Sequence, residues 1–79
     1  MRIITEQTEK IKISRGNDFT IFKIGEELFK IKNNLFEEIK KEALLSDEIK
    51  FFINDGEIVG VQLISLNLGV INEYGKLKV

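Results

Sequence analysis

The chain has 79 residues, of which 12 are basic and 13 acidic, and it contains neither cysteine nor histidine. This length allows one domain, since an independent core usually needs at least about 50 residues. The missing residue types exclude disulfide bonds, thiol redox chemistry and a structural zinc site, so we expect no cofactor and no metal ion. A net charge of −1 gives no overall attraction to nucleic acid or to anionic membranes.

The N-terminal residues 1–8 are the one stretch that we expect to be loosely held. Their apolar part consists of Ile3 and Ile4, which is too short for the core of a secretory signal, so we expect a cytoplasmic protein. Isoleucine, lysine and asparagine make up 29 of the 79 residues, a bias typical of an AT-rich genome.

The next part of the chain predicts three antiparallel strands. Lysine and isoleucine alternate over 10–13, and the Ser-Arg-Gly-Asn-Asp sequence of 14–18 is typical of a turn before a strand at 19–24. Gly25 then supplies the glycine that a type II′ turn requires before a third strand at 28–31.

One segment, 35–45, has the period of an amphipathic helix. Its apolar face contains Leu35, Phe36, Ile39 and Ala43. Asn34 fits the N-cap position, with Glu37 placed to complete a capping box. Glu37 and Lys41 have the spacing of a favourable ion pair, and Ser46-Asp47 should end the helix.

The C-terminal part begins with a second hairpin. Strands at 49–53 and 58–61 flank Asp55-Gly56, a strong signal for a tight turn. Residues 58–72 contain no charged side chain, and fully extended they would span about 50 Å, far more than the roughly 12 Å radius of gyration of such a domain. The run therefore either folds back at 67–69 or leaves its own subunit to pair with a second chain.

Within this run, the alternation of polar and apolar residues changes phase. The change predicts a bulge near Leu63-Ile64. A last short strand is predicted at 76–79. The predicted order β-β-β-α-β-β-β gives a single α+β domain over 1–79, with a mostly antiparallel sheet of five to six short strands and one helix packed on a face.

No catalytic motif is present, and Glu37, Glu38 and Glu42 have the spacing of a solvated helix face. We therefore expect a small, non-enzymatic binding or regulatory module that forms a homodimer and docks onto a macromolecular partner, most readily a protein. The residues expected to mediate self-association are Leu63, Ile64, Leu66, Leu68 and Val70.

A second hypothesis is a sheet surface that binds single-stranded nucleic acid. The residues that would carry it are Lys10, Lys12, Lys23, Lys30, Lys32 and Phe22, with Phe19 and Phe29 nearby. Against it, lysine alternating with isoleucine is normal for a half-exposed strand, whose phenylalanines usually face the core.

A third hypothesis concerns anions. The turn at 14–18 could hold a phosphate group on its backbone N–H groups beside Arg15 and Gly16. In this form the protein would bind a nucleotide or another small molecule at a dimer interface. An ordinary hairpin turn explains the same residues.

Overall fold

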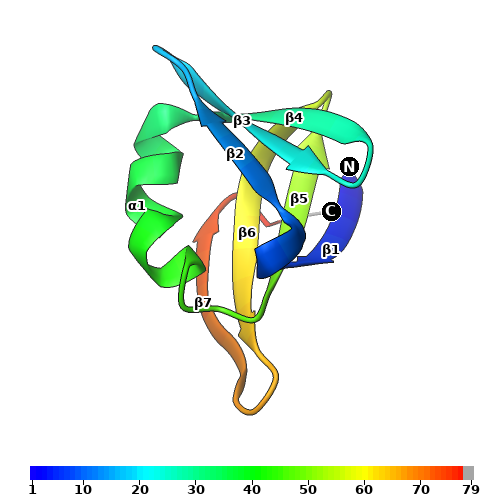
Figure 1. The fold of residues 1–79 in the computed structure, drawn as a ribbon, viewed down its shortest axis with the longest axis vertical. Coiled ribbons are helices and arrows are strands. Elements are labelled where there is room, and N and C mark those ends of the chain that lie inside the picture. The colour runs from blue at the N-terminus through cyan, green and yellow to red at the C-terminus, as the bar shows by residue number, and fades with distance from the viewer. Residues whose placement is uncertain (78–79) are drawn as a thin grey trace.

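The computed structural model describes residues 1–77 as one seven-stranded sheet with one α-helix packed against it (Figure 1). The strands are β1 (Arg2–Gln7), β2 (Lys12–Arg15), β3 (Phe19–Ile24), β4 (Glu27–Lys32), β5 (Glu48–Asn54), β6 (Glu57–Ser65) and β7 (Gly69–Gly75). The helix α1 spans Asn33–Ala43, and a single 3-10 turn, η1, spans Thr8–Lys10. The α+β class and the place of the helix between two groups of strands are confirmed, with one more strand before the helix than the sequence predicted.

The strands follow the order β1-β5-β6-β4-β3-β2, and β7 joins β6 beside this path. All pairs are antiparallel except β4 with β6, which are parallel and meet only at Lys30 with Glu57 and Ile31 with Ile58. One edge of β6 is therefore shared between β4 at its start and β7 from Gly60 onward. The sheet also curls. β1 and β2 are at opposite ends of the strand path, but only the short η1 separates them in sequence, so the two ends of the sheet must lie near each other.

The core lies inside this curl and is closed by the helix. Phe22 packs edge-to-face on Phe36 of α1 and on Phe51 of β5, with ring centroids 5.8 and 5.7 Å apart. Ile39 and Ala43 of α1 are also buried, so the predicted apolar face of the helix is the face that covers the core.

Asn33 fixes the start of the helix, one residue before the predicted N-cap. Its side-chain NH₂ donates to the carbonyl oxygens of Gly16 and Asn17, at 2.9 Å each, and its Oδ1 accepts from the hydroxyl of buried Thr20 at 2.7 Å. These bonds tie the β2–β3 turn to the first turn of α1. The position of the turn at 14–18 is thus fixed by contacts within the fold.

The predicted capping box is wrong. The N-cap position is Lys32, which makes no side-chain cap, because Asn33 is already helical and its side chain is committed to the β2–β3 turn. The predicted partner of Glu37 is also wrong, since its carboxylate pairs with Lys40 instead of Lys41.

The predicted turns are present. Asp55 and Gly56 both have positive φ, 51° and 76°, as a two-residue hairpin turn of the primed type requires. Gly25, between β3 and β4, has a φ of 62°.

The uncharged run folds back within its own chain. It forms β6 and β7, joined by the turn 66–68, and the register shifts between Leu63 and Ile64, where the sequence predicted a bulge. The sequence left open whether the run folds back or leaves its own subunit to pair with a second chain, and in the structure it folds back. The end of β6 and the turn project as a hairpin beyond the rest of the sheet (Figure 1).

Both ends of the chain differ from expectation. Residues 2–7, expected to be loosely held, form β1 and pair along β5 from Arg2 with Ile53 to Gln7 with Glu48. The guanidinium of Arg2 also makes two hydrogen bonds of 2.6 Å to the carboxylate of Glu27. Of the strand predicted at 76–79, residues 76 and 77 are in no strand, and the last two lie outside the described residues.

Two glycines, Gly60 of β6 and Gly75 of β7, allow the two backbones to approach closely where Gly75 ends β7. A Cβ at Gly75 would overlap the carbonyl oxygen of Val59, and a Cβ at Gly60 would overlap that of Lys76. The amide of Lys76 donates to the same Val59 oxygen at 2.7 Å. At this end of the β6–β7 pair the two backbones are therefore too close for any side chain at Gly60 or Gly75.

Gly75 and Gly69 provide a matched test of this close approach. Both have positive φ, 75° and 81°, but a Cβ at Gly69 would have no neighbour within 4 Å. We expect Gly69→Ala to cost about 1–2 kcal/mol for its backbone conformation alone. Gly75→Ala should cost about 1–3 kcal/mol more, because the added methyl group displaces backbone. Urea unfolding of both variants measures the difference, and equal destabilisation would contradict the close approach.

Candidate functional site

Four leucines lie exposed at one end of the molecule, and we call them the leucine end. They are Leu44, Leu45, Leu66 and Leu68, with exposed fractions of 76%, 83%, 74% and 82%. The first two follow the last turn of α1, and the other two form the tip of the β6–β7 hairpin, which lies at the same end of the molecule (Figure 1). Leu44 and Leu66 line a common hollow.

Asp47 holds the two parts of the leucine end together. Its Oδ2 accepts from the amide of Leu66 at 2.8 Å, and its own amide donates to the carbonyl oxygen of Ile64 at 2.9 Å. Glu9 and Glu48 line the same hollow as Asp47, and no lysine or arginine lines it. The leucine end therefore has an acidic rim.

The predicted self-association residues divide between the core and the surface. Leu63 is fully buried in its own subunit and so is inaccessible to a partner, and Ile64 is half-buried. Leu66, Leu68 and Val70 are exposed, Val70 by 50%. Sequence reasoning missed Leu44 and Leu45, although both follow Ala43, the last residue of the apolar helix face.

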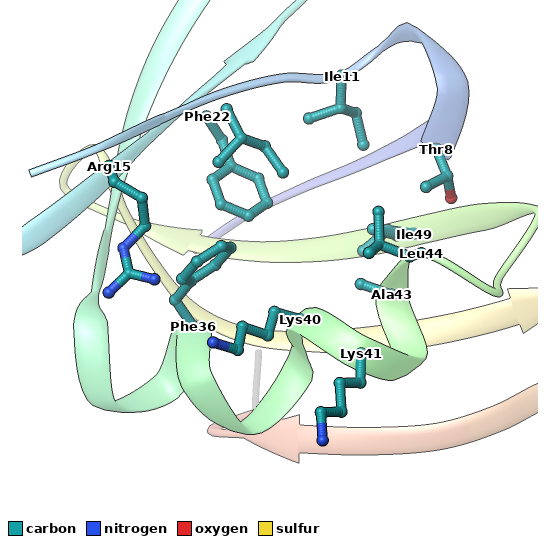
Figure 2. Close-up of a pocket in the computed structure, with 11 residues that line it drawn as sticks. Thr8, Ile11, Arg15, Phe22, Phe36, Lys40, Lys41, Ala43, Leu44 and Ile49 are labelled. Atoms are coloured by element: carbon teal, nitrogen blue, oxygen red, sulfur yellow. The ribbon is translucent and has the colours of Figure 1, made fainter.

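A second feature is an apolar groove of about 400 Å³ between β2 and α1, which we call the β2 groove (Figure 2). The apolar residues that line it are Ile11, Ile13, Phe22, Phe36, Ala43, Leu44 and Ile49. Thr8 lies at one end, and the charged lining residues are all cationic: Arg15, Lys40 and Lys41. In Figure 2 Lys40 lies along the helix toward Phe36, whereas Lys41 points outward.

Glu37 connects two of these cations. Its carboxylate oxygens lie 3.0 Å from Lys40 Nζ and 3.0 Å from Arg15 Nη1. The hydrogen bond from Lys40, together with the charges of Lys40 and Arg15, lowers the pKa of Glu37 below its ordinary value. The Arg15 guanidinium also lies over the ring of Phe36, 5.2 Å from its centroid. The cations beside the groove outnumber their one carboxylate partner.

The proposed anion residues already have partners in the fold. Arg15 pairs with Glu37, and the carbonyl of Gly16 accepts from Asn33. A Cβ at Gly16 would overlap the carbonyl oxygen of Phe19, which accounts for glycine there without a ligand. These residues lie beside the start of α1, whereas the leucine end lies at its other end (Figure 1).

The outer face of β2, β3 and β4 is basic. Lys12 is the register partner of Lys23, Lys30 that of Ile21, and Lys32 that of Phe19, so the four lysines share one side of the sheet. We call this the basic face. Lys10 lies in η1, away from it.

The predicted stacking residue Phe22 does not belong to the basic face. Its exposed fraction is 1% and that of Phe29 is 5%, so both are core residues. Phe19 is half-buried on the outer side, and Lys30 Nζ lies 4.7 Å from its ring centroid. Leu28, exposed by 66%, lies on the same side.

Two of the three carboxylates of α1, those of Glu37 and Glu42, make contacts within the fold. Glu42 accepts from the hydroxyl of Tyr74 at 2.8 Å and from the amide of Asn72 at 3.1 Å, which joins the helix to β7. The hydrogen bond to Glu42 raises the pKa of Tyr74 above its ordinary value. Residues 1–77 contain no group of three or more carboxylate side chains that could hold a metal ion, and none of their helices is long and apolar enough to cross a membrane.

Comparison of this chain with protein-family models, with curated proteins and with solved structures gives no match. Inferences about function therefore rest on the three surfaces described above.

The ion pairs of Glu37 should make the stability of the fold depend on pH. Because the pKa of this carboxyl is lowered in the folded state, its contribution to stability is present above the ordinary value of 4.5 and is lost as the pH falls through the lowered value. We expect Glu37→Gln to lower the melting temperature at about pH 7, and the difference from wild type to shrink toward about pH 2. Glu38→Gln is the control, since Glu38 has no ion pair in residues 1–77. A constant difference across this pH range would contradict the assignment.

Proposed function

We propose that this protein is a small, non-enzymatic interaction module that forms a homodimer through the leucine end and binds a protein partner. One observation carries the proposal. The part of the uncharged run that lies outside the core, residues 66–72, is exposed throughout and still contains no charged residue. In a chain that is 32% charged, an exposed stretch without charge is typical of a surface that a partner covers.

A second copy of the chain is the partner that we favour for the leucine end. A twofold dimer brings the same patch of both subunits together, so four leucines of one subunit meet four of the other. The hydrophobic gain of about 25 cal/mol per Å² would add stability that a domain of this size otherwise has in short supply. The β6–β7 hairpin projects beyond the rest of the sheet (Figure 1), so the exposed leucines at its tip are within reach of a partner.

Charged substitutions at the hairpin tip test the dimer. We expect the double variant Leu66→Asp, Leu68→Asp to be monomeric and folded. Its free energy of unfolding as a monomer should fall by no more than about 1 kcal/mol, because both side chains are exposed and only repulsion from the acidic rim opposes the change. Leu28→Asp is the matched control, since Leu28 is also an exposed leucine, at 66%, but lies on the basic face. Sedimentation equilibrium at micromolar concentration measures the mass of each. A wild-type protein that is monomeric there would remove the dimer from the proposal.

The acidic rim adds a salt dependence to the same measurement. In a twofold dimer Glu9, Asp47 and Glu48 of the two subunits approach each other, and salt screens their repulsion. We therefore expect dimerisation to strengthen between about 0.05 M and about 0.5 M salt. An interface held by opposite charges would show the reverse.

The basic face favours one second candidate function, the binding of single-stranded nucleic acid. Four of the five predicted lysines share this face, and none of them has an ion pair in residues 1–77. Against this function, Phe19, the aromatic side chain that the described residues place on the basic face, is half-buried and already covered by Lys30.

Oligonucleotide binding separates the two functions. If the basic face binds nucleic acid, a labelled single-stranded oligonucleotide should bind at about 50 mM salt. Each change of Lys12, Lys23 or Lys32 to glutamine should then make the negative slope of log affinity against log salt less steep by about 0.7. Lys76→Gln, outside the basic face, should leave the slope unchanged. Absence of binding at this low salt would exclude the second candidate.

A further inference from the structure

The strand β2 has a free edge that runs beside the β2 groove. It ends the strand path and pairs only with β3, and none of its residues makes a backbone hydrogen bond outside that pair in the described part of the chain. In an antiparallel pair, alternate residues turn their N–H and C=O groups away from the neighbouring strand. The edge of β2 therefore presents backbone donors and acceptors that an added strand could use.

The β2 groove lies where the side chains of an added strand would point. Ile13 and Arg15 of β2 line it, and Phe22, the register partner of Ile13, forms part of its floor with Phe36 from the helix (Figure 2). Successive side chains of a strand point to opposite faces, so every second side chain of a strand paired with β2 would enter the groove. The groove surface there is apolar, and these inward residues should be apolar as well.

The charges around β2 favour acidic residues at the positions of the added strand that face away from the groove. On the outer side of β2, Lys12 would be the cross-strand neighbour of an outward side chain, and Lys23, one strand further in, adds to the positive charge of that side. Around the groove itself Arg15, Lys40 and Lys41 are the charged lining residues, and none that lines it is acidic. A strand with apolar residues inward and acidic residues outward would thus match the groove on one side and Lys12 on the other. The cations around the groove, of which Arg15 and Lys40 already pair with Glu37, would attract only its overall negative charge.

We infer that the β2 groove binds an extended peptide segment of alternating apolar and acidic residues, which adds to the edge of β2 as a further strand. Backbone hydrogen bonds to β2 would supply affinity, and the groove and the lysines would select the sequence. The inference rests on the protein-binding half of the proposed function. Leu44 belongs to both surfaces, but the groove does not need the dimer in order to bind a peptide.

Other occupants match fewer of the observations. A small amphiphilic anion could use the groove and its cations but would leave the edge of β2 unpaired. The hairpin of a second copy is uncharged over 58–72, so it does not match the cations around the groove. The experiment below separates both from a peptide strand.

Three synthetic peptides of about eight residues, the usual length of a strand or slightly more, test the inference. The first alternates valine with glutamate, the second replaces glutamate by lysine, and the third repeats the first with N-methyl groups that remove alternate backbone N–H donors. Fluorescence anisotropy with the full chain should give a Kd below about 1 mM for the first peptide and no measurable binding for the other two. Hydrogen exchange should show new protection at residues 12–15.

Variants of the groove locate the binding. Ile13→Asp, which puts a carboxylate on the groove wall, should weaken binding of the valine-glutamate peptide by about tenfold or more. Lys40→Gln should weaken it less, and Lys76→Gln, away from the groove, should leave it unchanged. Thermal melts confirm that each variant is folded, which Ile13→Asp should be, since Ile13 is 45% exposed.

Three results would overturn the inference. Equal affinity for the N-methylated peptide would show insertion of side chains without strand pairing, as an amphiphile would insert. If hydrogen exchange showed protection at the leucine end and not at residues 12–15, the peptide would bind to a different surface. If no peptide bound, the chain would have no peptide site of this kind. The monomeric Leu66→Asp, Leu68→Asp variant should bind the peptide as wild type does, so failure of the dimer and failure of the peptide site are distinguishable.

Discussion

The divided edge of β6 is the constraint on which the rest of the structure depends. Because β4 occupies this edge only at Glu57 and Ile58 and β7 occupies it from Gly60, the two groups of strands separate beyond that point. The helix α1 packs at this separation, and its Phe36, Ile39 and Ala43 complete the core there. The β2 groove lies between the covering helix and one end of the curled sheet, and the leucine end lies where that helix finishes.

Local signals in the sequence predicted much of this fold. The Asp55-Gly56 turn, the bulge after Leu63 and the apolar face of the helix follow from backbone and side-chain chemistry within a few residues, and all three are present. β1 was not predicted, because its order comes from pairing with β5, more than 40 residues away, and not from its own sequence. The capping box failed for a similar reason, since Asn33 binds a turn distant in sequence.

The candidate surfaces were predicted less completely, because each combines residues from separate elements. The uncharged run indicated Leu66 and Leu68, but nothing local to Leu44 or Leu45 places them beside that hairpin. The lysine alternation identified most of the basic face, yet only the strand register shows that Phe22 faces inward. The β2 groove had no sequence signal at all, since its lining residues come from β2, β3, β5, α1 and η1 and meet only in the folded chain.

The distant pairing of β1 sets an order of events during synthesis. Arg2 pairs with Ile53 and Gln7 with Glu48, so β1 is synthesised well before its partner and has no neighbouring strand until β5 has emerged from the ribosome. Strands β2 to β4 and the helix can form contacts earlier, because their partners are close in sequence. The nascent chain thus keeps Ile4, which packs against the core in the native fold, uncovered until β5 is available, and the pairing of β1 with β5 is a late step toward the native state.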